Sequence, residues 1–254
     1  MKRLIQVEKV EKYYGSKSNV TKALDGVDFD VAEGEFTGIM GASGSGKSTL
    51  LNVLSTIDTV TSGHVYFRGT DISTLNEEQV AKFRKVNIGF VFQDFNLLDT
   101  LTIEENITLA MTLQDHPKPD IQQRVHKLLE QLGIREVADK FPYEVSGGQK
   151  QRCACARAIA NQPLVIMADE PTGALDSKSA QTLLETFVTM NQKMNSTILM
   201  VTHDAFSASY CKRILFLKDG QIFHELIRGE KSRREFLNDI LDVLAVFGGG
   251  GGNV

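Results

Sequence analysis

The start of the chain alternates apolar and polar positions in the way that is typical of β-strands buried on one face. The apolar positions of this pattern are Leu4, Val7, Val10, Val27, Phe29 and Val31. Gly15-Ser16 and Glu33-Gly34 are turn signals that follow the two runs. We therefore expect an antiparallel β-layer at the start of the chain.

Four later runs predict further strands, and the continuously apolar run at 164–168 is typical of a central parallel strand that is buried on both faces. They cover residues 36–40, 88–92, 164–168 and 197–202. Near the C-terminus, Asp219-Gly220 separates two more strand-like runs and is a strong signal for a hairpin turn. The pattern therefore predicts a sheet core in addition to the antiparallel layer.

Helical periodicity appears between these strands. It covers residues 49–54, 76–85 and 179–190, and most of 103–160, where Pro117 and Pro119 interrupt it. We expect residues from about 94 to 160 to form an α-helical subdomain that is inserted between two strands of the core. The whole pattern predicts an α/β domain over residues 1–228, with an antiparallel β-subdomain and this helical insertion.

A last amphipathic helix is expected over residues 229–247. Its apolar positions are Phe236, Leu237, Ile240, Leu241, Leu244 and Phe247. We expect this helix to pack on its own domain, and docking on a partner is the alternative. The glycine-rich residues 248–254 are expected to be a disordered tail.

The predicted strand at 36–40 and the helix at 49–54 flank a loop with the spacing G-x-x-x-x-G-K-[ST], which is that of a P-loop. Its backbone N–H groups and the following helix N-terminus favour the phosphates of a nucleoside triphosphate. Lys47 is expected to reach the β- and γ-phosphates, and Ser48 to give its hydroxyl to Mg²⁺. The nucleotide contacts predicted here are Gly41, Ala42, Ser43, Gly44, Ser45, Gly46, Lys47, Ser48 and Thr49. A glycine-rich turn without a ligand is the alternative, which the flanking strand and helix disfavour.

Residues at the ends of three predicted strands are candidates for the other roles in hydrolysis. Asp169 ends a buried apolar run, where a P-loop NTPase places the carboxylate that holds Mg²⁺ through water. Glu170 follows it and is placed to activate the attacking water as a general base. His203 follows another strand and is expected to donate a hydrogen bond to the γ-phosphate. Tyr14, beside Gly15, is our choice for an aromatic ring that stacks on adenine, and a role in covering the surface is the alternative.

Composition narrows the class of protein. The chain has 254 residues and a net charge of −4, which gives no indication of a nucleic-acid partner. Its three cysteines, Cys153, Cys155 and Cys211, lack metal-ligand spacing and are expected to be reduced thiols. No apolar run approaches the ~20 residues of a membrane helix. If the protein works at a membrane, we expect another chain to span it.

Residues 145–149, Val-Ser-Gly-Gly-Gln, make the prediction specific. A P-loop, a glutamine after a strand, S-G-G-Q, an Asp-Glu strand end and a later histidine, in this order, resemble the ATP-binding-cassette (ABC) ATPases over about residues 4–225. Ser146, Gly147, Gly148 and Gln149 lie at a helix start and would form a second anion site. In the family this site closes on the nucleotide of a second protomer. The resemblance therefore implies a head-to-tail homodimer with ATP between its subunits.

The resemblance also implies roles for single residues. Tyr14 matches the adenine-stacking aromatic, and Gln93 matches the glutamine that senses Mg²⁺ and the attacking water. Asp176 lies in the loop that crosses the dimer interface, and His203 matches the switch histidine. Val145 stands where the family most often has leucine, an apolar exchange that should leave the anion site intact. We expect an active ATPase with ATP and Mg²⁺ as its cofactors.

Within the family, the chain is similar to the branch of macrolide-export, lipoprotein-release and cell-division ATPases and bacitracin-type resistance transporters. Residues 41–48, 90–93, 96–98 and 168–177 carry this likeness. Ala174, residues 209–211 and the extra C-terminal helix are most similar to the bacitracin type. This likeness implies a subunit at the cytoplasmic face of the membrane, with a permease and sometimes a sensor kinase as partners. It also implies resistance to peptide antibiotics such as bacitracin or lantibiotics.

Phe95, Leu97 and Leu98 are expected to be exposed and lie where the family receives the permease's coupling helix. The nearest alternative is an ATPase of a lipoprotein-release, macrolide-export or cell-division complex. A soluble ABC ATPase of DNA repair or translation is disfavoured, since the chain has neither a long coiled-coil insertion nor a second cassette. S-G-G-Q and His203 disfavour a P-loop kinase or GTPase.

Overall fold

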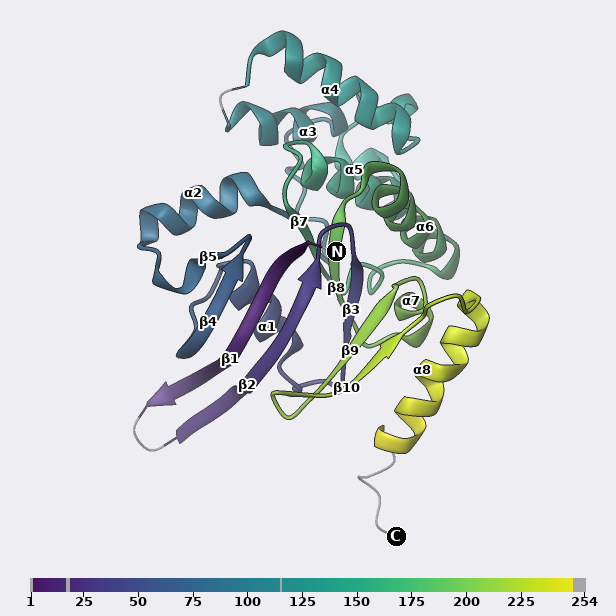
Figure 1. Cartoon of the computed structure of the whole chain (residues 1–254). Coiled ribbons are helices and arrows are strands. Elements are labelled where there is room, and N and C mark those ends of the chain that lie inside the picture. The colour runs from purple at the N-terminus through teal and green to yellow at the C-terminus, as the bar shows by residue number, and fades with distance from the viewer. Residues whose placement is uncertain (1, 17–18, 115, 249–254) are drawn as a thin grey trace. The chain divides into compact units, whose positions relative to one another are not determined.

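The computed structural model describes residues 2–16, 19–114 and 116–248 (Figure 1). The chain forms two compact units: the first contains the chain up to Asn76 and from Leu199 onward, and the second is Glu77–Ile198. The segment 94–160, predicted to be a helical insertion, lies within the second unit. Among the described residues, no helix is both long enough and apolar enough to cross a membrane.

The first unit begins with the predicted antiparallel layer. Its strands are β1 (Arg3–Ser16), β2 (Asn19–Ala32), β4 (Ser62–Phe67) and β5 (Thr70–Asp71), in the order β2-β1-β4-β5. Val7 pairs with Phe29 on one side and with Val65 on the other. Val7, Val10 and Val27 are buried, which confirms that the alternating pattern marks one buried face.

The second sheet of this unit has the order β10-β9-β3-β8. Its strands are β3 (Phe36–Met40), β8 (Thr197–Thr202, which begins in the second unit), β9 (Arg213–Lys218) and β10 (Gln221–Ile227). β3 is parallel to β9 and buried throughout. The hairpin predicted at Asp219-Gly220 joins β9 to β10, and the positive φ angles of 50° and 77° suit a tight turn of this kind.

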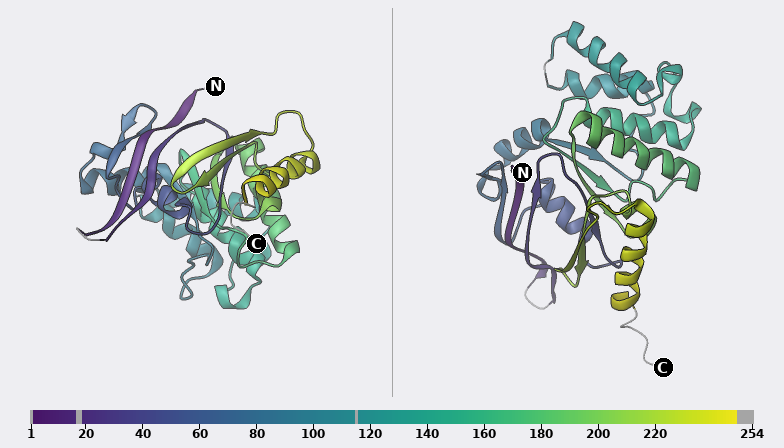
Figure 2. Two further views of the ribbon diagram at one scale, coloured as in Figure 1. Left: turned by 90° about the horizontal axis from the view of Figure 1, so that it is seen from below. Right: turned by 45° about the vertical axis from the view of Figure 1, so that its right-hand side comes forward.

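The helices of the first unit are short except at the C-terminus. They are α1 (Lys47–Leu54), the 3₁₀ turn η1 (Ile72–Thr74), α7 (Ala205–Ala208) and α8 (Arg233–Gly248). α8, yellow in Figure 2, packs against α7. Phe236 and Ile240 are fully buried, and the Arg233 guanidinium lies 4.3 Å from the Tyr210 ring centroid. The predicted packing of this helix on its own domain is confirmed, although Leu241 is exposed. Gly248, the first residue of the expected disordered tail, is instead the last residue of α8, and residues 249–254 lie outside the described residues.

The second unit contains two parallel strands and most of the helices. Its elements are α2 (Glu77–Asn87), β6 (Ile88–Val91), α3 (Ile103–Thr112), α4 (Lys118–Gln131), η2 (Arg135–Val137), η3 (Pro142–Glu144), α5 (Gly147–Ile159), β7 (Val165–Asp169) and α6 (Ser177–Met194). β6 is parallel to β7. α5 lies directly on β6, because a Cβ atom at Gly89 would be 2.2 Å from the Ala158 carbonyl oxygen. Pro117 is the N-cap of α4 and Pro119 lies in its first turn, so these prolines begin a helix.

Candidate active site

The loop between β3 and α1 closes tightly around its own lysine. The Lys47 Nζ atom donates hydrogen bonds of 2.9 Å to the carbonyl oxygens of Gly41 and Ala42, and the side chain is buried. Gly46 is the N-cap of α1 with φ 102°, a conformation that favours glycine. Ser48 is exposed in the first turn of α1. The structure therefore brings the predicted phosphate-binding residues together at a helix N-terminus.

The β9–β10 hairpin contacts the backbone of this loop and supports it. The Gly220 N–H donates a hydrogen bond of 3.1 Å to the Ser45 carbonyl oxygen. A Cβ atom at Gly41 would lie 2.2 Å from the Leu217 carbonyl oxygen, and one at Gly46 would lie 2.4 Å from that of Ala23. In the sequence, Gly220 is only a turn residue, and no local signal shows that the P-loop rests on it.

Tyr14, the predicted adenine-stacking residue, is held by two charged neighbours. It is 41% exposed, its hydroxyl donates to Asp58 Oδ2 at 2.7 Å, and Lys12 Nζ lies 5.1 Å from its ring centroid. Burial, and next the hydrogen bond to Asp58, raise the pKa of Tyr14, and its hydroxyl also interacts with Thr49. The structure thus places Tyr14 beside the first turns of the P-loop helix. No pattern in the sequence indicates the roles of Lys12 and Asp58.

His203 directly follows β8 and is exposed in the first unit. Asp204, the next residue, caps α7 by accepting hydrogen bonds from the N–H groups of Phe206 at 3.2 Å and Ser207 at 2.8 Å. This cap holds the backbone that carries the histidine.

In the second unit, Gln93 follows β6 and lies against the turn after Glu170. A Cβ atom at Gly173 would be 3.1 Å from the Gln93 amide carbon and nitrogen. Asp169 is the last residue of β7, and Glu170 has a left-handed backbone with φ 44°. The Gly173 N–H closes this turn on the Glu170 carbonyl at 3.0 Å. The structure therefore brings Gln93 and Glu170 close together at the neighbouring ends of β6 and β7.

The loop after Gln93 is strained and tied to α5. Phe95 and Asn96 both have positive φ angles, of 61° and 48°. The Arg157 guanidinium donates hydrogen bonds to the carbonyl oxygens of both residues, at 2.9 Å for Phe95. Of the apolar residues predicted to be exposed here, only Leu98 is, at 48%, since Phe95 and Leu97 are half-buried. The expectation for those two residues was wrong. For Phe95, Arg157 of α5 holds its backbone, and a Cβ atom at Gly147 would lie 4.0 Å from its ring.

Ser146 is the N-cap of α5, which begins at Gly147, so S-G-G-Q lies at a helix start as predicted. The Ser146 hydroxyl accepts from the Gln149 N–H at 3.3 Å, and Gln149 Oε1 accepts from the Ser146 N–H at 2.9 Å. The N–H groups of Gly147 and Gly148 are therefore first-turn donors without an intrahelical acceptor. This geometry fits an anion site.

Asp176, predicted for the dimer interface, is the N-cap of α6. It accepts from the N–H groups of Lys178 and Ser179, each at 3.0 Å, and from the Ser179 hydroxyl at 2.7 Å. These bonds, that of the hydroxyl first, hold the pKa of Asp176 below its usual value. A Cβ atom at Gly148 would lie 3.3 Å from the Ser179 hydroxyl oxygen, so the N-termini of α5 and α6 are neighbours.

The oxygen atoms of Ser48, Asp169 and Gln93 are ligands of the hard kind that Mg²⁺ prefers. Ser48 exposes its hydroxyl at the N-terminus of α1, as a residue that shares Mg²⁺ with a bound phosphate must. Within the described part of the chain, no group of three His, Cys, Asp or Glu side chains gathers to hold a metal ion by itself. Ser48 in the first unit, and Asp169 and Gln93 in the second, are each of the donor type that binds an ion also held by a nucleotide's phosphates.

The cysteines have no part in these sites. All three are buried and unbonded to one another, as expected for reduced thiols. Burial raises the pKa of Cys153 to about 12, and the pKa values of Cys155 and Cys211 still further. Such thiols are unreactive.

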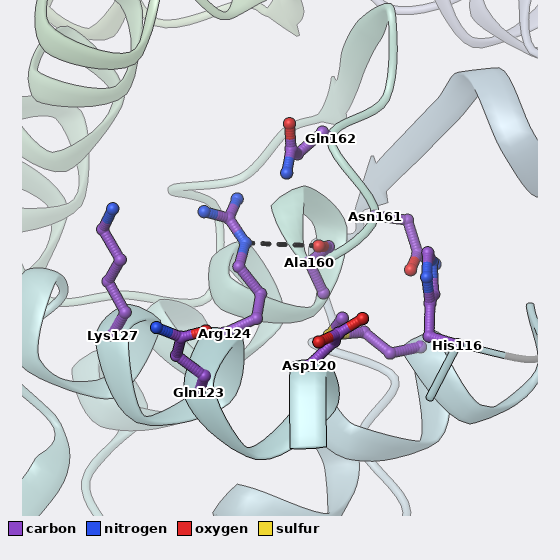
Figure 3. A pocket seen from close by; sticks show the side chains of 9 residues that line it. His116, Asp120, Gln123, Arg124, Lys127, Ala160, Asn161 and Gln162 are labelled. Atoms are coloured by element: carbon purple, nitrogen blue, oxygen red, sulfur yellow. Dashed lines mark hydrogen bonds between the residues drawn. The ribbon is translucent and has the colours of Figure 1, made fainter. Parts of the chain in front are cut away.

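A pocket of about 400 Å³ lies between α4 and the end of α5 (Figure 3). Its most buried cation is Arg124, which donates to the carbonyl oxygens of Ile159, the last residue of α5, at 3.1 Å and of its C-cap Ala160 at 3.4 Å. A cation at a helix C-terminus stabilises the helix. The lining includes none of the predicted nucleotide residues, so we assign this arginine to helix capping.

A family model described as ABC transporter matches residues 24–173. The chain belongs to the ABC transporter family and is its ATP-binding, ATP-hydrolysing cassette, which confirms the predicted fold and activity. It is 48% identical over 246 residues to the bacitracin export ATP-binding protein BceA of Halalkalibacterium halodurans, covering 97% of each chain. It is 51% identical over 238 residues to the uncharacterized ABC transporter ATP-binding protein YvcR of Bacillus subtilis, covering 93% of this chain and 92% of that one.

A solved structure is also similar to most of this chain. The cassette MJ0796 of Methanocaldococcus jannaschii, a dimer in a post-hydrolysis state with ADP and Pi, matches with a TM-score of 0.80 and 37% identity. The match covers 88% of this chain and 98% of that chain.

Proposed function

We propose that this ATPase drives a membrane permease that confers resistance to cell-wall-targeting peptide antibiotics such as bacitracin or lantibiotics. The observation that supports this most is the 48% identity to a bacitracin export ATP-binding protein along 97% of both chains. The chain works at the cytoplasmic face of the cell membrane, where the permease holds it. A sensor kinase is an indirect partner, through the permease.

The proposed chemistry begins with the phosphates. Lys47 binds the β- and γ-phosphates, and the N–H groups of the P-loop surround their oxygens. Mg²⁺, when bound, neutralises developing phosphate charge, and Ser48, Asp169 and Gln93 are its proposed ligands. Tyr14 stacks on adenine. The family motifs support these assignments, together with the local geometry within each unit.

Hydrolysis then needs an activated water. Glu170 is the proposed general base, because its turn follows a buried strand and meets the Gln93 side chain. Gln93 orients the water, and His203 donates a hydrogen bond to the γ-phosphate. The loss of that phosphate is the proposed event that drives the conformational change of the permease.

A second copy of the chain completes the proposed site. The first-turn N–H groups of Gly147 and Gly148 have no acceptor within their helix, and Ser146 holds that turn. We propose that they bind the γ-phosphate on the P-loop of a partner subunit, with Asp176 near the interface. The dimeric structure of the related cassette supports this arrangement.

The proposed function is tested by antibiotic susceptibility in cells that express this chain with its permease. The wild-type pair should raise the inhibitory concentration of bacitracin, and Glu170→Gln or Lys47→Ala should abolish the increase at equal protein level. An increase for erythromycin instead of bacitracin would contradict the proposal and indicate macrolide export.

Docking of the permease is tested at Leu98, which is 48% exposed beside the Gln93 loop. Leu98→Asp should prevent co-purification of the permease. Leu113→Asp is the matched control, since Leu113 is 60% exposed at the end of α3. Equal retention of the permease by both variants would contradict docking at this loop.

A further inference from the structure

Gln151 is a fully buried amide in the second turn of α5, and the proposed chemistry does not use it. Its Nε2 atom donates a hydrogen bond of 3.0 Å to the Pro171 carbonyl oxygen and one of 3.4 Å to the Phe92 carbonyl oxygen. Carbonyl oxygens only accept, so both partners require the nitrogen of the amide on this side. The orientation of the side chain is thereby determined by its two partners.

The two carbonyl groups belong to the segments that carry the proposed hydrolytic residues. Phe92 precedes Gln93, and Pro171 follows Glu170. The Gln93 side chain also lies against Gly173, in the turn that Gly173 closes on the Glu170 carbonyl. One amide group therefore joins the backbone at the end of β6 to the backbone after β7.

The Glu170 backbone needs such support. Its φ of 44° is left-handed, a conformation that a residue with a side chain keeps only when its surroundings impose it. The hydrogen bond from Gln151 restrains the carbonyl group of Pro171, the residue that follows Glu170. It acts together with the bond of Gly173 to Glu170.

The other end of the amide shows that packing alone does not explain this residue. Gln151 Oε1 is buried and has no hydrogen-bond partner in the described part of the chain. A buried acceptor without a partner is unfavourable, whereas an apolar side chain of the same shape avoids that cost. The NH₂ group is what the two backbone segments use.

We propose that Gln151 is a positioning residue for ATP hydrolysis, which holds Gln93 and Glu170 in register with each other through their backbones. Gln151 lies on the helix whose N-cap is Ser146, so it also ties this register to the second anion site. The inference rests on the proposed roles of Gln93 and Glu170. It predicts an effect on turnover that exceeds the effect on nucleotide binding.

The test replaces Gln151 with methionine, which keeps the shape and removes the NH₂ group. We expect kcat to fall at least about tenfold, because Gln93 and Glu170 would no longer be held in the geometry that hydrolysis needs. The Kd of a fluorescent ATP analogue should stay within about twofold. Gln122→Met is the control, because Gln122 is exposed on α4 in the same unit, and it should retain wild-type kcat and Kd.

A second variant keeps the inference testable if methionine destabilises the fold. In Gln151→Glu, the ionised carboxylate has no proton to donate and faces two carbonyl oxygens, whereas the protonated acid donates to one of them. Burial raises the pKa of such a carboxyl group. The kcat of this variant relative to wild type should therefore rise as pH falls from 9 to 6.

The inference is overturned if Gln151→Met retains wild-type kcat. It is also overturned if kcat and nucleotide affinity fall in the same proportion, or if the relative kcat of Gln151→Glu is independent of pH. Failure of the proposed role of Glu170 gives a different result. In that case Glu170→Gln would retain the ATP turnover of the wild-type protein.

Discussion

At the scale of single residues, Asp58 shows how a side chain outside any motif supports the proposed nucleotide site. It accepts hydrogen bonds from Lys12 at 2.5 Å and from Tyr14 at 2.7 Å. Burial raises the pKa of Asp58, but these two bonds, with one from the Thr59 N–H, outweigh it and keep the pKa below its usual value. Asp58 is therefore a carboxylate that orients the proposed adenine-stacking ring.

This shift predicts a pH dependence of stability. The folded state binds the Asp58 proton less readily than the unfolded state, so the carboxylate stabilises the fold above an ordinary carboxyl pKa of about 4. The stabilisation is lost as pH falls through the lower pKa of the folded state. The difference in Tm between wild type and Asp58→Asn should thus be present at pH 7 and shrink towards pH 3. A difference that is constant between these pH values would contradict the assignment.

Motif residues were predictable one by one, because the spacing of a P-loop or of S-G-G-Q is itself the requirement for binding. Lys47, Ser146 and Glu170 lie at the helix starts and strand ends that the sequence predicts for them. Asp58 and Gln151 were not predictable. Lys12 lies 46 residues from Asp58 and Pro171 lies 20 residues from Gln151, and only the folded chain brings them together.

At the scale of elements, the P-loop depends on a hairpin from the other end of the chain. Gly220 and Gly69 both have positive φ angles, of 77° and 83°. A Cβ atom at Gly220 would lie 2.9 Å from the Ala23 carbonyl oxygen, whereas one at Gly69 would have no neighbour within 4 Å. An alanine at Gly69 therefore introduces backbone strain alone. An alanine at Gly220 introduces the same strain and also a close contact with the Ala23 backbone.

We predict that Gly69→Ala costs about 1–2 kcal/mol of stability through strain alone. Gly220→Ala should cost more, because its methyl group meets the backbone. It should also weaken ATP binding, because it displaces the N–H that holds Ser45. Thermal unfolding and nucleotide titration measure the two effects. Equal ATP affinity of the two variants would show that the hairpin is not needed to shape the loop.

Substitutions in two capping boxes would distinguish a helix start that only stabilises the fold from one that also takes part in hydrolysis. Thr102 caps α3 and Ser146 caps α5 with the same reciprocal hydrogen bonds. Replacing either residue by alanine should cost about 1 kcal/mol of stability. Only Ser146→Ala should lower the ATPase rate, since only α5 carries the proposed anion site. A similar loss of rate in Thr102→Ala would attribute the effect to stability.

At the scale of the whole molecule, the proposed hydrolysis depends on pairing of two chains. Glu170→Gln removes the general base but leaves the phosphate contacts, so ATP should bind and hold the dimer without turnover. Size-exclusion chromatography with ATP should show a species of twice the monomer mass, and Lys47→Ala should remain monomeric. Monomeric Glu170→Gln in saturating ATP would contradict the sandwich arrangement.

The sequence by itself determined the class of the protein, most of its strands and helices, and the motif residues that are proposed to bind ATP. Those features depend on short-range patterns, namely strand alternation, helical periodicity and motif spacing. Tertiary structure alone decided that Phe95 and Leu97 are half-buried, that Gly220 supports the P-loop and that Gln151 joins two strand ends. Each of these follows from contacts between distant segments, whose geometry no local pattern encodes.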